Sequence, residues 1–147
     1  MKTISAAIFL AFVMMGSALA QKTPRGETYD TQIIRVNDGD TVVIAATYLP
    51  KPLKPELAVR VFGVDTPEKG HRAQCAKEAA AAELASAYTK DLIKNGKKFQ
   101  VTLYSWDKFG GRVLGDITVD GQSIRAGLIK NGHAREYYGE AKQSWCN

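Results

Sequence analysis

One long alanine-rich stretch divides the chain into two groups of shorter segments. Alanine is the best helix former and Asn95-Gly96 is a typical helix stop, so we expect a helix over Gln74 to Asn95. Four side chains recur at intervals of four residues within it and predict the stripe that the helix buries. These residues are Ala80, Leu84, Tyr88 and Leu92. The rest of the core must come from the segments on either side.

Runs in which apolar and polar residues alternate, as is typical of β-strands, lie on both sides of this helix. Three precede it and two follow it: residues 29–36, 41–47, 57–64, 99–104 and 113–119. Ser123 is placed to cap a short second helix over Ile124 to Asn131. The order of these elements predicts an α+β, mostly β, fold. We expect a five-stranded OB-fold barrel with the long helix between strands three and four and a short C-terminal helix.

The beginning of the chain has the features of a secretory signal peptide. A basic start precedes an apolar run, and a small-x-small cleavage signal ends at Ala20. The run is too short for a membrane anchor, which is the alternative interpretation. We therefore expect residues 1–20 to be removed by cleavage after Ala20. Residues 21–28 are then a flexible leader, and residues 29–147 form one domain, periplasmic or secreted and not bound to a membrane.

Two cysteines, Cys75 and Cys146, are present in the chain. An even number of cysteines in an oxidising compartment favours a disulfide, which would tie the C-terminal tail to the start of the long helix. Two free thiols are the alternative. A zinc site is not expected, because no histidine or further cysteine lies at ligand spacing from either residue.

Basic residues outnumber acidic ones in the chain, with 20 Lys and Arg against 15 Asp and Glu and a net charge of +5. Such a surplus suits an anionic partner such as nucleic acid. It is also common among soluble basic proteins, so charge alone does not identify a nucleic-acid-binding protein.

Three polar motifs lie where strands are expected to end. They are Asp38-Gly39-Asp40-Thr41, Arg60 with Asp65-Thr66-Pro67-Glu68, and the segment from Asp107 to Arg112. Taken singly, each has an ordinary structural explanation. Asp-Gly pairs form hairpin turns, an Asp-Thr-Pro-Glu run starts a helix, and arginines on strands are solvated.

Together, the three motifs contain the groups that phosphodiester cleavage requires. Asp40 and Asp65 offer hard oxygen ligands, which suit Ca²⁺ or Mg²⁺ rather than zinc. Arg60 and Arg112 carry the forked, permanent charge that grips a phosphate. Glu68 can act as a general base or position a water molecule. We therefore hypothesise a metal-dependent enzyme that cleaves phosphodiester bonds.

The order and spacing of these motifs resemble those of the staphylococcal nuclease family, and the resemblance extends from about Thr31 to Ala134. It implies an OB-fold barrel and Ca²⁺-dependent cleavage of DNA and RNA. It also implies a role for each matching residue. Asp40 and Asp65 match the carboxylates that bind Ca²⁺ in the family, and Thr66 matches the residue whose carbonyl is a further ligand. Glu68 matches the carboxylate that works on the attacking water, and Arg60 and Arg112 match the two phosphate-binding arginines. Asp38 matches a nearby acid outside the ligand set.

The chain departs from the family pattern in three places. Phe109 stands where the family has tyrosine, and Gly111 is an extra residue that is able to re-aim the arginine after it. Residues 69–74 are shorter than the family's flexible loop. Tyr137 and Tyr138 resemble the family's stacking tyrosines only loosely, so they either stack on a base or pack within the protein.

The spacing of Arg60 and Asp65 places a condition on the fold. They lie an odd number of residues apart, and strict alternation along a strand puts them on opposite faces. Gly63 is the expected position of the bend that brings them together.

The remaining polar candidates have weaker support. His71 lies in a basic loop and His133 has no partner in sequence, so neither is expected to be catalytic. Four basic residues either follow a phosphate backbone or are simply solvated. They are Lys69, Arg72, Lys108 and Lys130.

Two other classes of function compete with the nuclease. An OB-fold that binds single strands without cutting them would be expected to lack one of the carboxylates or arginines, and all are present. A secreted structural barrel leaves the combination of acids and arginines unexplained. The favoured hypothesis is therefore a monomeric nuclease that acts on DNA and RNA.

Overall fold

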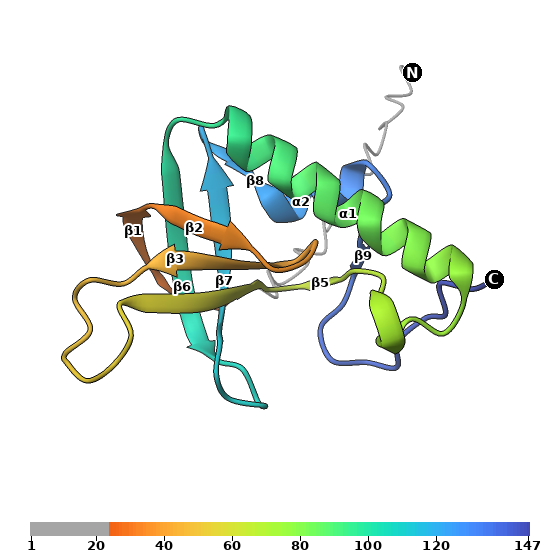
Figure 1. Ribbon diagram of the computed structural model, residues 1–147, viewed down its shortest axis with the longest axis horizontal. Helices are drawn as coiled ribbons and strands as arrows, with labels where there is room; N and C mark the ends of the chain where they lie inside the picture. The colour runs from red at the N-terminus through yellow and green to blue at the C-terminus, as the bar shows by residue number, and fades with distance from the viewer. Residues whose placement is uncertain (1–23) are drawn as a thin grey trace, which may run out of the picture.

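A computed structural model describes residues 24–147 of the chain (Figure 1). The predicted signal peptide, residues 1–20, and the first part of the predicted leader lie outside these residues. The leader is shorter than expected, because Glu27 and Thr28 already belong to the first strand. Among the described residues, no helix is long and apolar enough to cross a membrane.

A mixed sheet forms most of the domain. Its long strands are β1 (Glu27–Thr31), β2 (Ile33–Val36), β3 (Thr41–Ala45), β4 (Glu56–Val61), β6 (Phe99–Trp106) and β7 (Val113–Val119). They follow the order β1-β6-β7-β4-β3-β2, and the short β8 (Gln122–Ser123) pairs with β7. All neighbouring strands are antiparallel except β4 and β7, which are parallel.

The first predicted strand is bent, which explains how this sheet curls. It is interrupted at Gln32, so that β1 pairs with β6 while β2 pairs with β3. The two ends of the strand order therefore belong to one continuous segment of chain. Five long segments arranged in this way, with a helix between the third and fourth, confirm the predicted α+β, mostly β, fold of the OB type.

The long helix α1 (Ala76–Asn95) crosses one side of the sheet (Figure 1). Its position agrees with the prediction, but the predicted buried stripe is wrong in its first half, because Ala80 is exposed and Leu84 is 61% exposed. Tyr88 and Leu92 do pack against the core. The residues that α1 buries are instead Glu78, Ala82, Ala85, Ser86 and Thr89.

Small side chains set the face that α1 presents, because the helix lies very close to the turn between β2 and β3. A Cβ atom added at Gly39 would lie 2.8 Å from the Cβ of Ala85, so neither position accepts a larger side chain without movement. The Thr89 hydroxyl donates a hydrogen bond of 2.7 Å to the Gly39 carbonyl oxygen. The helix therefore fixes the turn that carries Asp38 and Asp40.

The core lies between the curved sheet and the two helices. In β7, every second residue is buried, as the alternating pattern predicts. Apart from Thr89 of α1, the largest fully buried side chains come from the strands and from the second helix, α2 (Ile124–Lys130). Ser123 caps α2 by accepting a hydrogen bond of 3.3 Å from the backbone N–H of Ala126, as predicted.

The C-terminal tail returns to the beginning of α1. Two residues of the tail form β9 (Arg135–Glu136), which pairs with β5 (Val64–Asp65). The predicted disulfide between Cys75 and Cys146 is present and fastens the end of the chain beside the first turn of α1. β9 was not predicted, because a strand of two residues has no detectable period.

Candidate active site

Asp40 is the point where the first two motifs meet. It ends the turn held by α1 and is buried. Thr41 donates a hydrogen bond of 2.9 Å to its Oδ1, and Thr66 donates one of 3.1 Å to its Oδ2. The guanidinium of Arg60 lies 3.5 Å from the same Oδ2. Residues 20 and 26 positions away in sequence are thus brought to one carboxylate.

The bend between Arg60 and Asp65 lies at Gly63, as the spacing of the two residues required. β4 ends at Val61, β5 begins at Val64, and Gly63 adopts a φ of +76°. This left-handed conformation favours glycine and ends the alternation of the strand. It allows Asp65 to enter β5 while Arg60 remains on β4.

Both oxygen atoms of Asp65 contact the C-terminal tail. The side chain is only 6% exposed. The ammonium of Lys142 lies 2.6 Å from Oδ1, and the indole N–H of Trp145 donates a hydrogen bond of 3.2 Å to Oδ2. Burial lowers the pKa of Lys142, but contact with Asp65 and the charges of Asp65 and Glu68 raise it to a net value above its ordinary one. Lys142 is therefore a cation fixed on a buried carboxylate, and sequence reasoning missed it.

Glu68 lies at the surface beside this pair. One oxygen is 3.4 Å from the ammonium of Lys142, and the other is 3.3 Å from Nε of Arg72. The backbone around it is held by Glu78, whose buried carboxylate accepts hydrogen bonds from the backbone N–H groups of Glu68 and Gln74. Glu78 was also missed. Its only signal in the sequence is an acid in the first turn of a helix, which is common at such positions.

Asp107 holds Arg112, the arginine after the extra glycine. Nε of Arg112 donates a hydrogen bond of 2.5 Å to the buried Asp107 carboxylate. Burial raises the pKa of Asp107, but the hydrogen bond and charge of Arg112, followed by the charge of Arg60, lower it to a net value below the ordinary one. The turn between Asp107 and Arg112 is made by Gly110 and Gly111, which adopt φ values of +69° and +73°. The charges of both arginines thus lower the pKa of Asp107, and Arg112 keeps its ion pair with this carboxylate despite the extra residue.

Asp38 is a second acid beside Asp40. Burial, followed by the charge of Asp40, raises its pKa from 3.8 to about 6. Its Oδ1 is buried and has no hydrogen-bond partner among the residues that the structure describes. In the metal-free fold, this side chain therefore keeps its proton to a higher pH than an ordinary aspartate does.

The raised pKa of Asp38 gives a testable dependence of stability on pH. A group whose pKa is raised on folding stabilises the fold below its unfolded pKa, and this contribution disappears as the pH rises through the folded pKa. We expect the free energy of unfolding of the metal-free protein to fall between about pH 4 and pH 6, by about 1–2 kcal/mol after allowance for partial exposure. Asp38→Asn should remove the part of this fall that Asp38 contributes, as measured by urea unfolding in the presence of chelator, while the raised pKa of Asp116 remains.

The matched control for Asp38 is Asp91→Asn, which removes a carboxylate from the exposed side of α1. This variant should keep the dependence on pH that the unmodified protein shows. A fall of the same size in the Asp38 variant would contradict the assignment of the effect to Asp38.

The donor atoms of the site fit a hard divalent cation in their chemistry. Asp40 and Asp65 supply carboxylate oxygens, and the ammonium of Lys142 shows that a cation is held between Asp65 and Glu68. Among residues 24–147, no group of three Asp, Glu, His or Cys side chains is arranged to hold a metal ion. The prediction of Ca²⁺, like the role of the Thr66 carbonyl, stays a prediction.

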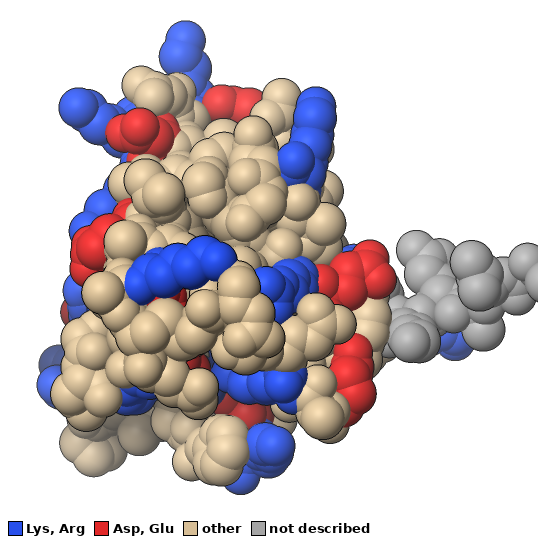
Figure 2. Space-filling model, turned by 90° about the vertical axis from the view of Figure 1, so that its right-hand side faces the viewer, with Lys and Arg blue, Asp and Glu red and all other residues tan. Residues whose placement is uncertain are grey.

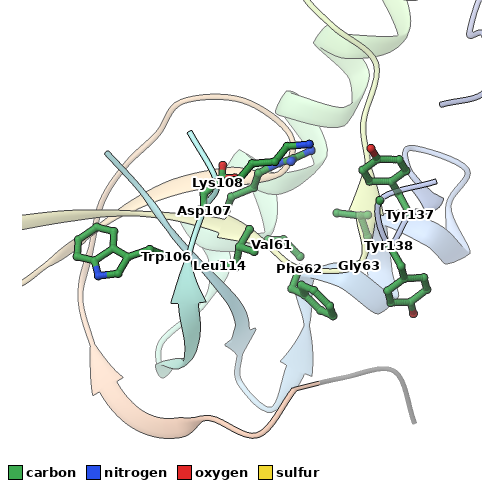
Figure 3. Close-up of a pocket in the computed structure, with 12 residues that line it drawn as sticks. Val61, Phe62, Gly63, Trp106, Asp107, Lys108, Leu114, Tyr137 and Tyr138 are labelled. Atoms are coloured by element: carbon green, nitrogen blue, oxygen red, sulfur yellow. The ribbon is translucent and has the colours of Figure 1, made fainter. Parts of the chain in front are cut away.

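An apolar pocket of about 280 Å³ lies next to Arg60. Figure 3 shows Tyr137 and Tyr138 on one side of it and Asp107, Lys108 and Trp106 on the other, with Val61, Phe62 and Leu114 between them. The rings of Tyr138 and Phe62 pack edge to face at 5.8 Å, and Arg125 donates a hydrogen bond to the Tyr138 hydroxyl. Tyr138 is therefore packed within the protein, and both tyrosines also face a space beside the arginine.

Neither histidine takes part in the hydrogen bonds and ion pairs described above. The ring of His133 packs on Tyr88 at 5.2 Å. His71 is an exposed residue of the short 3₁₀ helix η1 (Gly70–Arg72), and no hydrogen bond or ion pair of its side chain is found in the described part of the chain. That neither histidine is catalytic stays a prediction.

The four basic candidates have different surroundings. Lys69 donates a hydrogen bond to the Asn37 carbonyl oxygen, Arg72 pairs with Glu68, Lys108 lies 5.0 Å from the centre of the Phe109 ring, and Lys130 ends α2. Figure 2 shows basic side chains across the middle of the face that holds the end of the chain, with most of the visible acidic ones nearer its margins. Such a face suits an anionic polymer.

Comparison with known proteins gives consistent matches. A family described as "Staphylococcal nuclease homologue" matches residues 58–145, more than half of the chain. Endonuclease YhcR of Bacillus subtilis (strain 168) is 33% identical over 126 residues, which are 81% of this chain and 10% of that protein. The SPbeta prophage-derived endonuclease YokF of the same organism is 33% identical over 114 residues, or 76% of this chain and 36% of that protein. The chain thus spans only a tenth to about a third of these relatives.

Proposed function

Since this chain belongs to the family of staphylococcal nuclease homologues, we propose that it is a metal-dependent nuclease that hydrolyses phosphodiester bonds of DNA and RNA. The observation that supports this most is the meeting of the first two motifs at Asp40. Its carboxylate contacts Arg60 from β4 and Thr66 from the Asp-Thr-Pro-Glu motif. A buried acid beside a permanent cation is a suitable setting for a metal ion and a phosphate group.

In this proposal, three residues hold the cation. Asp40 and Asp65 supply carboxylate oxygens and Thr66 its main-chain carbonyl, and the hard character of these donors favours Ca²⁺. When bound, a divalent cation polarises a phosphoryl oxygen and offsets negative charge that develops in the transition state.

The other site residues act on the phosphate and on water. Arg60 and Arg112 bind the scissile phosphate, and Asp107 keeps the Arg112 side chain in place through its hydrogen bond of 2.5 Å. Glu68 orients a water molecule for in-line attack and accepts its proton. The pocket beside Arg60 receives the neighbouring base, with the rings of Tyr137 and Tyr138 along one side.

We also propose that the protein works outside the cytoplasm as a monomer. The disulfide between Cys75 and Cys146 supports an oxidising compartment, where such bonds persist. The features of the first twenty residues support export followed by cleavage after Ala20.

The proposal predicts Ca²⁺-dependent cleavage of single-stranded DNA by the purified, oxidised protein. We expect cutting with Ca²⁺ and none with chelator. Asp40→Asn removes one proposed ligand charge and should require much more Ca²⁺ for the same rate, measured from a Ca²⁺ titration of cleavage. Asp91→Asn is the matched control for loss of a carboxylate. Cutting that continues in chelator would reject metal dependence, and a folded protein that binds the strand without cutting would favour a binding module.

A further inference from the structure

The last eleven residues form a strap over the acidic part of the site. We define the C-terminal strap as residues 137–147. Within this strap, Lys142 forms an ion pair with one carboxylate oxygen of Asp65, and the indole N–H of Trp145 donates a hydrogen bond to the other. Lys142 also forms an ion pair with Glu68. In Figure 1 the strap is the dark blue end of the chain, which runs from β9 to the start of α1. None of the three sequence motifs includes any residue of the strap.

The strap is fastened at both ends. At its beginning, the backbone N–H of Tyr137 donates a hydrogen bond of 3.1 Å to the Gly63 carbonyl oxygen, next to the pairing of β9 with β5. At its end, Cys146 is bonded to Cys75. Between these points, Arg135 donates a hydrogen bond of 3.0 Å to the Ser144 carbonyl oxygen. The position of Lys142 is therefore imposed by the fold around it.

The guanidinium of Arg135 also holds Trp145, since it lies 3.9 Å from the centre of the indole ring. This contact orients the indole so that its N–H points to Asp65. Trp145 is thus held by Arg135 and by the disulfide, while Lys142 is held by its own ion pairs and by the strap that the disulfide fastens.

The burial of Asp65 explains why this arrangement matters. A carboxylate on a side chain that is 6% exposed is costly to keep ionised without a counter-charge. Lys142 supplies that charge in the protein without metal. A divalent cation placed on the same oxygen would repel the ammonium, so the two cannot both occupy it at close range.

We propose that the C-terminal strap is a built-in competitor for the cation site: the Lys142 ammonium and a divalent cation exclude each other at Asp65 and Glu68, and metal binding moves the strap off Asp65. The strap stabilises the carboxylate while the metal is absent and raises the metal concentration that the site needs. This inference rests on the assignment of Asp65 to the metal in the proposed function.

The first test measures metal binding in the absence of nucleic acid. Lys142→Met keeps most of the side-chain volume and removes the charge. We expect it to bind Ca²⁺ about tenfold more tightly than the unmodified protein in isothermal titration calorimetry, a modest change because Lys142 is partly exposed. Lys90→Met removes the same charge from an exposed position of α1 and should leave the affinity nearly unchanged.

The second test follows the strap itself. Trp145 and Trp106 are the two tryptophans of the chain, so Trp106→Phe leaves Trp145 as the single reporter. Adding Ca²⁺ should shift the emission of Trp145 along the same curve as the calorimetric binding. In Lys142→Met, half of the shift should be reached at a lower Ca²⁺ concentration.

Three results would overturn the proposal. They are equal Ca²⁺ affinity in Lys142→Met and the unmodified protein, an equal gain in Lys90→Met, and Ca²⁺ binding that leaves Trp145 emission unchanged. Absence of binding in every variant would also overturn it. Failure of the nuclease proposal is a separate observation, since a protein that binds Ca²⁺ in competition with Lys142 but does not cut nucleic acid rejects only the activity.

Discussion

Replacing Glu68 with glutamine is expected to lower the rate of phosphodiester cleavage by about 100-fold or more, the usual range for loss of a general base. Glutamine keeps the size of the side chain but cannot accept a proton from water. The side chain is 37% exposed and its ion pairs with Arg72 and Lys142 lie at the surface, so the fold should change little. The measurement is the single-turnover rate on single-stranded DNA at saturating Ca²⁺, together with thermal unfolding.

The matched control for this experiment is Glu83→Gln, which removes an exposed carboxylate from α1 without touching the site. Its cleavage rate should equal that of the unmodified protein. Ca²⁺ affinity measured by calorimetry separates loss of chemistry from loss of metal. An unchanged rate in Glu68→Gln with metal bound would remove Glu68 from the mechanism and leave the two arginines as the main contributors.

The sequence carried enough information to predict the fold, because its strands have a clear period and its one long helix is compositionally distinct. The alternation in β7 matches the burial of every second residue. The face of α1 was mispredicted because the contact with Gly39 depends on side-chain size, which places Ala85 inside and leaves the larger Leu84 in solvent. A rule based on hydrophobicity alone cannot detect a close approach of this kind.

The site residues, too, include some that sequence motifs predict and others that only the fold brings to the site. Asp40, Arg60 and Thr66 lie in short motifs, and the structure brings them into one network. Asp65 also lies in a motif, but its partners Lys142 and Trp145 are more than seventy residues away. Such partners have no local pattern. The fold determines them through the return of the chain along β9 and the disulfide.

Asp107 and Glu78 show a second reason why the roles of site residues escape sequence analysis. Both are acids that hold other site elements, one by pairing with Arg112 and the other by accepting two backbone hydrogen bonds near Glu68. In sequence they look like an ordinary turn residue and an ordinary acid in the first turn of a helix. Their roles depend on burial, which becomes evident only in three dimensions.

Loss of the disulfide is expected to lower the free energy of unfolding by about 3–4 kcal/mol on the chain-entropy model, because the bond closes a long loop. Cys146→Ala tests this while keeping the Cys75 sulfur, which accepts a hydrogen bond from the backbone N–H of Glu78 at the start of α1. Urea unfolding of the oxidised protein, the reduced protein and the variant is the measurement. The reduced protein and the variant should lose similar amounts.

The same bond links stability to the site, since it holds the strap that carries Lys142. Cys146→Ala should therefore also bind Ca²⁺ more tightly than the oxidised protein, in the direction expected for Lys142→Met, because a loosened strap competes less well for Asp65. A loss of stability with unchanged Ca²⁺ affinity would show that the disulfide only limits the unfolded chain. Tighter Ca²⁺ binding in a less stable protein would instead show that the protein gives up metal affinity in exchange for a more stable fold.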